Sequence, residues 1–168
     1  TGIVSGGGGI YSTHDLTIDG CTISSNSTAG YGGGMFLGRS STITNCSVEM
    51  NESNYGGGMA DDMTANANVI THSLFKGNKA AGTGGGIAIG YAQTAVESCM
   101  FTSNSAGGGG GVSIAVLNSP VRNCQFYANS ATNGAPFGGG GAQGIDFANC
   151  IFSNNWAAGI GGGVVAHG

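Results

Sequence analysis

The chain has 168 residues, of which 36 are glycines, with 4 basic and 8 acidic side chains and a net charge of −4. So few basic residues exclude the positive surface that nucleic acids or anionic membranes require, and no apolar run is long enough for direct membrane insertion. The 40% hydrophobic content argues against a disordered linker, and glycine does not recur at every third position as in collagen.

An internal repeat of about 26 residues runs through the chain. Each unit contains an asparagine, preceded three residues earlier by an apolar residue and five residues earlier by a cysteine or, once, by Ser73. A Gly-Gly-Gly block and another apolar residue then follow. The recurring asparagines are Asn26, Asn51, Asn78, Asn104, Asn129 and Asn155. The recurring cysteines are Cys21, Cys46, Cys99, Cys124 and Cys150.

Short strands are predicted where inward and outward positions alternate, first at residues 16–18 and 21–23, and later at 87–89 and 99–101. Glycine-rich and asparagine-rich turns separate these strands and leave no room for helices. The predicted fold is therefore all-β: a single-stranded right-handed parallel β-helix, or β-solenoid, of about six coils. It forms one domain over residues 1–168, with no polar or helical cap predicted at either end.

Equivalent residues on adjacent coils should stack into ladders ~4.8 Å apart. We expect the asparagine ladder to be buried and structural. We expect the cysteine column to be inward and reduced, because stacked Cβ atoms lie beyond the ~3.5–4.5 Å that a disulfide prefers. Three same-column pairs are predicted to form cross-strand ion pairs. They are Glu49 with Lys76, Glu52 with Lys79, and Glu97 with Arg122.

Two features of the repeat point to recognition or assembly. Insertions at residues 61–68 and 131–137 place Asp61, Asp62, Asn133 and Phe137 in candidate binding loops. The glycine blocks allow two explanations: a tight inner corner where only glycine fits, or a flat face against which a second solenoid packs.

The Phe-x-x-Asn motifs at residues 75–78, 101–104, 126–129 and 152–155 occur together with Gly-Gly-Gly blocks. These motifs resemble the repeats of chlamydial polymorphic outer-membrane proteins and similar autotransporter passengers, which carry Gly-Gly-Ala at the glycine block. The resemblance covers essentially the whole chain. It implies a secreted right-handed β-helix used in adhesion or surface display.

No catalytic, metal or cofactor site is predicted, because the carboxylates and histidines do not gather in one set of columns. The predicted function is that of a non-catalytic extracellular structural β-solenoid, either a surface scaffold or adhesin or the subunit of a self-assembling filament. The alternative is a polysaccharide-binding or pectate-lyase-like carbohydrate-active β-helix. Expected partners are further copies, bound end to end or through the glycine face, and host or surface glycans.

Overall fold

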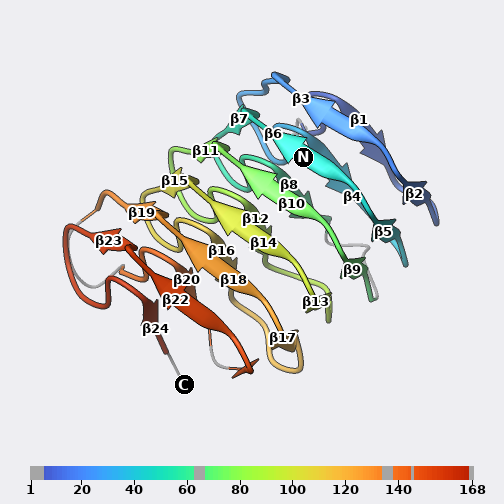
Figure 1. Ribbon diagram of the computed structural model, residues 1–168. Coiled ribbons are helices and arrows are strands. Elements are labelled where there is room, and N and C mark those ends of the chain that lie inside the picture. The colour runs from blue at the N-terminus through green and yellow to red at the C-terminus, as the bar shows by residue number, and fades with distance from the viewer. Residues whose placement is uncertain (1–5, 63–66, 134–137, 145, 167–168) are drawn as a thin grey trace.

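The computed structural model describes residues 6–62, 67–133, 138–144 and 146–166. In this part of the chain the backbone winds into successive coils that stack from the N-terminal to the C-terminal side, as Figure 1 shows. Each strand pairs in parallel with the equivalent strands of the neighbouring coils. The predicted all-β parallel solenoid is confirmed.

Four parallel sheets run along the stack. Sheet 1 contains β1 (Ile10–Ser12), β4 (Met35–Leu37), β8 (Met59–Asp61), β12 (Ile87–Ile89), β16 (Val112–Ile114), β20 (Ala142–Gln143) and β24 (Val164–Val165). Sheet 2 contains β2 (Thr17–Asp19), β5 (Thr42–Thr44), β9 (Val69–Thr71), β13 (Ala95–Glu97), β17 (Val121–Arg122) and β21 (Phe147–Ala148). Sheet 3 contains β3 (Thr22–Ser24), β6 (Ser47–Glu49), β10 (Leu74–Lys76), β14 (Met100–Thr102), β18 (Gln125–Tyr127) and β22 (Ile151–Ser153). Sheet 4 contains β7 (Glu52–Ser53), β11 (Lys79–Ala80), β15 (Ser105–Ala106), β19 (Ser130–Ala131) and β23 (Trp156–Ala157).

The core is built from the inward position of each short strand. In sheet 3 this position carries an aromatic ring in four consecutive coils, and Phe101 stacks on Phe75 and on Phe126 with ring centroids 5.1 and 4.9 Å apart. Phe126 stacks in turn on Phe152 at 4.7 Å. The four phenylalanines are register partners on neighbouring parallel strands, and this pairing places each ring directly over the next.

The asparagine ladder follows sheet 3 and is buried except at its two ends. The Nδ2 of Asn104 donates to Oδ1 of Asn129 at 3.0 Å, and its own Oδ1 accepts from the backbone N–H and Nδ2 of Asn78. The same Nδ2 also donates to the carbonyl of Phe75. Each interior side chain therefore satisfies two backbone groups of the preceding coil and bonds to the ladder side chains on both sides, as predicted.

The residue before each ladder asparagine adopts a left-handed conformation. Met50, Ser103 and Ala128 have φ of 51°, 56° and 52° there, and only Gly77 supplies a glycine in this column. Non-glycine residues adopt this region at a cost of about 1–2 kcal/mol. The stacked turn therefore imposes a conformation that residues such as methionine and alanine do not prefer.

The glycine blocks form a tight inner corner between sheets 4 and 1. Their first position has positive φ, as at Gly84 and Gly109. A Cβ atom at the second position, as at Gly85, would collide with carbonyl oxygens of Gly110 and Ser105. The blocks of the interior coils are buried within the same chain. This geometry supports the corner explanation, because the glycines make room for the next coil's backbone.

A second buried polar ladder precedes sheet 2, and the sequence patterns did not indicate it. The Oδ1 of Asn68 accepts from the N–H of Ser41 at 2.9 Å, and the N–H of Thr94 donates to Oγ of Ser119 at 3.2 Å. All four side chains are almost fully buried. Because the residue type changes at every rung, no repeated letter marks this ladder in the sequence.

Candidate binding groove

A groove of about 390 Å³ crosses the outer face of sheet 1 over β8, β12 and β16. Its floor is formed by Ala60, Ala88 and Ser113, which are register partners on successive coils. On the preceding coil the same column carries Phe36, and Tyr11 lies one coil further. The groove therefore begins where this outward column changes from aromatic to small side chains.

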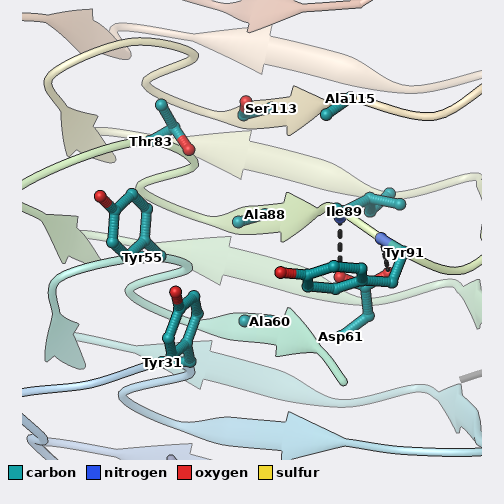
Figure 2. Close-up of a pocket in the computed structure, with 11 residues that line it drawn as sticks. Tyr31, Tyr55, Ala60, Asp61, Thr83, Ala88, Ile89, Tyr91, Ser113 and Ala115 are labelled. Carbon is teal, nitrogen blue, oxygen red and sulfur yellow. Dashed lines mark hydrogen bonds between the residues drawn. The ribbon is translucent and has the colours of Figure 1, made fainter. Parts of the chain in front are cut away.

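Two stacked tyrosines form one wall of the groove. Tyr31 and Tyr55 precede equivalent glycine blocks, and their ring centroids lie 5.1 Å apart at an interplanar angle of 19°. Tyr31 also contacts the ring of Phe36 at 5.7 Å, and Thr83 continues the wall on the next coil. In Figure 2 these wall residues follow one another along the stack, parallel to the small residues of the floor.

Tyr91 belongs to the opposite wall, with Gly90 and Ala115. It lies two residues after the end of β12, is 52% exposed, and in Figure 2 its ring extends over the groove toward Tyr55. The backbone that carries it is fixed by Asp61. The carboxylate of Asp61 accepts from the N–H groups of Gly90 and Tyr91 at 2.7 and 2.8 Å, and from the N–H of Ala92.

Asp61, predicted as a candidate binding-loop residue, lines the groove and has a structural role in it. It ends β8 in the column of Leu37, and only 2% of its surface is exposed. Burial raises the pKa of its carboxyl group, and the three amide donors oppose that rise. With both oxygens engaged by backbone amides, this carboxylate adds little free hydrogen-bonding capacity to the groove.

The groove carries hydroxyl groups that have no partner in the chain. The hydroxyls of Tyr31, Tyr55, Tyr91, Thr83 and Ser113 make no hydrogen bond with any other residue in the described part of the protein. None of the four basic residues lines the groove. The surface is therefore concave, partly aromatic, rich in hydroxyls and free of positive charge.

Asp62 and Asn133, two other predicted loop residues, do not line this groove. Asp62 is partly buried just after β8, where its N–H donates to the carbonyl of Leu37. Asn133 is exposed after β19, and its N–H donates to the carbonyl of Gly107. Phe137 falls outside the described residues, so its prediction is not tested.

All five cysteines are free, and their exposure follows their place in the stack. Cys46, Cys99 and Cys124 are buried, whereas Cys21 is exposed and Cys150 is partly buried. The thiol of Cys46 donates to the carbonyl two residues earlier, at 3.1 Å, and Ser73 makes the same contact with its hydroxyl. That these cysteines are reduced in the protein's natural environment stays a prediction.

Burial and thiol contacts shift several cysteine pKa values. Burial raises the pKa of Cys46 and of Cys150. The thiols of Cys99 and Cys124 are neighbours in the column, and their interaction lowers the pKa of Cys99 and raises that of Cys124. Within the described residues, no group of three or more His, Cys, Asp or Glu side chains is placed to hold a metal ion.

The three predicted ion pairs are correct in their strand register but not in their side-chain contacts. Glu49 faces Lys76 and Glu97 faces Arg122 in the strand register, and Glu52 likewise faces Lys79. In the described chain, however, none of these pairs closes to ion-pair distance. Arg122 instead contacts Asp146 at 3.3 Å, and Glu97 accepts from Asn123. Correct register does not fix where long, exposed side chains point.

Comparison with known proteins supports the fold and no more specific family. The family described as "Right handed beta helix region" matches residues 2–119 of the chain. No curated protein and no solved structure matches it. In the described residues, no helix is long and apolar enough for a membrane span. Since the match covers well over half of the chain, the protein belongs to the right-handed β-helix family.

Proposed function

We propose that the protein is a non-catalytic structural β-solenoid that works outside the cell as a surface scaffold or adhesin. The observation that carries this proposal is the unbroken asparagine ladder, from Asn26 through Asn155, which ties each coil to the next by side-chain hydrogen bonds that are buried in the interior coils. Such a stack forms a rigid support whose outer faces are free for display. The resemblance to polymorphic outer-membrane protein repeats supports the location and the role in adhesion.

Two carboxylates that share a column are too far apart to act as a hydrolytic pair. Asp19 and Glu97 share one column of sheet 2 but are three coils apart, or ~14 Å at ~4.8 Å per coil. Glycoside hydrolases hold their two carboxylates about 5–9.5 Å apart. Asp146 pairs with Arg122 on an exposed surface, with 42% and 45% of their side chains accessible, and Asp61 is occupied by backbone amides.

Two measurements test this proposal. Antibody labelling of intact and permeabilised cells of the source organism should give equal signals, since the protein is expected at the outer surface. Incubation with pectate, alginate and xylan should release no unsaturated or reducing ends. Labelling that requires permeabilisation would refute the location, and turnover of any of these polymers would refute the non-catalytic role.

End-to-end association of copies is part of the same proposal. Solenoid coils present the same backbone pairing groups at each level, so one stack can continue another in register. Size-exclusion chromatography at increasing protein concentration tests it. A single monomer peak throughout would exclude filament formation by the isolated chain.

A further inference from the structure

We propose that the groove on sheet 1 binds a short segment of an extended, neutral polysaccharide. This inference rests on the proposed surface role and names the ligand class that the adhesin would hold. The argument comes from the shape, the charge and the hydrogen-bonding groups of the residues around Ala88 and Tyr91.

The dimensions of the groove suit a polysaccharide that runs parallel to the solenoid axis. The small floor residues Ala60, Ala88 and Ser113 lie on successive coils, and Figure 2 shows them in a row along the stack. Coils repeat every ~4.8 Å, about the length of one pyranose unit in an extended glycan. Successive sugar units would therefore meet equivalent positions on successive coils.

The chemistry of the walls matches that of a neutral sugar. A pyranose ring has flat C–H faces and a rim of hydroxyl groups. Tyr91 offers an exposed ring beside the alanine floor, and the unpaired hydroxyls of Tyr31, Tyr55 and Thr83 offer donors and acceptors at the rim. Aromatic surface combined with a few polar groups is typical of small-ligand sites of this size.

The lack of positive charge in the groove favours neutral glycans over acidic ones. Uronate, sulfate and phosphate ligands need a cation or free N–H groups to balance their charge. Arg39, Lys76, Lys79 and Arg122 all lie outside the groove. The amides nearest to it, those of Gly90 and Tyr91, already donate to Asp61.

A bound peptide fits this surface less well. Extended peptides bind β-structures by adding a strand at a sheet edge, where backbone N–H and C=O groups are free. The groove lies on the face of sheet 1, and its strands β8, β12 and β16 are paired on both sides. A peptide would therefore gain side-chain contacts only.

Isothermal titration with cellohexaose, mannohexaose, xylohexaose, laminarihexaose and maltohexaose tests the proposal, with hexagalacturonate as the acidic comparison. At least one neutral hexasaccharide should bind with a Kd of about 1 mM or tighter, and hexagalacturonate should not. Absence of binding by all five neutral chains, or binding of hexagalacturonate alone, would overturn it. Chromatography of the recovered sugars keeps the two proposals apart, because cleavage would refute the non-catalytic role while leaving binding intact.

Three variants locate the site. Tyr91→Ala should weaken binding by about tenfold or more through the lost ring contact. Ala88→Phe should abolish binding, because it fills the floor with the side chain that Phe36 already places in the same column. Tyr127→Ala, an equally exposed tyrosine on sheet 3, is the matched control and should bind as the wild type does. Equal losses in Tyr91→Ala and Tyr127→Ala, with native circular dichroism, would place the ligand elsewhere.

Discussion

Replacement of one interior rung, Asn104→Ala, should lower the free energy of unfolding by about 2–4 kcal/mol. The substitution removes the side-chain bonds to Asn129 and Phe75 and leaves the buried N–H of Asn78 without its acceptor. The unpaired N–H alone costs ~1–3 kcal/mol, and each further bond contributes ~0.5–1.5 kcal/mol net. These terms add to ~2–6 kcal/mol. Because Asn129 and the side chain of Asn78 each keep another hydrogen bond, we expect a loss in the lower part of that range.

Guanidinium denaturation followed by circular dichroism measures the global loss. Amide hydrogen exchange by NMR measures the local one, since the N–H of Asn78 should exchange much faster in the variant. Asn133→Ala is the control, because this exposed asparagine makes no side-chain hydrogen bond with a described residue. A loss below ~0.5 kcal/mol with unchanged protection of Asn78 would refute the argument that the ladder stabilises the turns.

Three further predictions follow from the corner, the buried carboxylate and the thiols. Gly110→Ala should destabilise the fold by about 3 kcal/mol or more in denaturant titrations, since its Cβ would meet two carbonyl oxygens, whereas Gly90→Ala, which has room, should stay within ~0.5 kcal/mol. The raised pKa of Asp61 means that the folded state binds this proton more tightly than the unfolded state, so its contribution to stability should be full below the unfolded pKa of ~3.9 and fall as the pH rises through the folded pKa. Denaturation between acid and neutral pH checks this, and Asp61→Asn should remove that part of the slope; a slope unchanged in the variant would contradict it. A thiol reagent should label exposed Cys21 rapidly and buried Cys124 only after unfolding, as peptide mass spectrometry would show; rapid native labelling of both would contradict the buried column.

The fold could be predicted from the sequence because its main determinants recur as identical letters. Asparagine and phenylalanine return at a nearly constant interval, and this interval alone sets the strand register, as between Phe101 and Phe126. The left-handed turn residues were not visible, because Met50 and Ala128 are not typical of such turns. Their conformation is imposed by the stack and not by local preference.

The groove was missed for a related reason. The residues of the groove come from four coils, and no single coil contains a sequence motif that would mark a binding site. The repeats do contain a signal for the groove when they are compared with one another. Tyr31 and Tyr55 precede equivalent glycine blocks, and Ala60 is equivalent to Ala88 one coil later. Reading outward columns for size, as well as inward columns for hydrophobicity, would have indicated a hollow there.

The asparagine ladder also gives the solenoid a direction. Every Nδ2 points to the Oδ1 of the coil that follows it, from Asn26 to Asn51 and onward to Asn155. The amide dipoles therefore add along the axis, and each coil offers an acceptor to its predecessor and a donor to its successor. A coil inserted or removed in phase keeps this one-way chain of donors and acceptors intact, while a coil docked upside down would set donor against donor. The number of coils is thus free to vary, but their orientation is not.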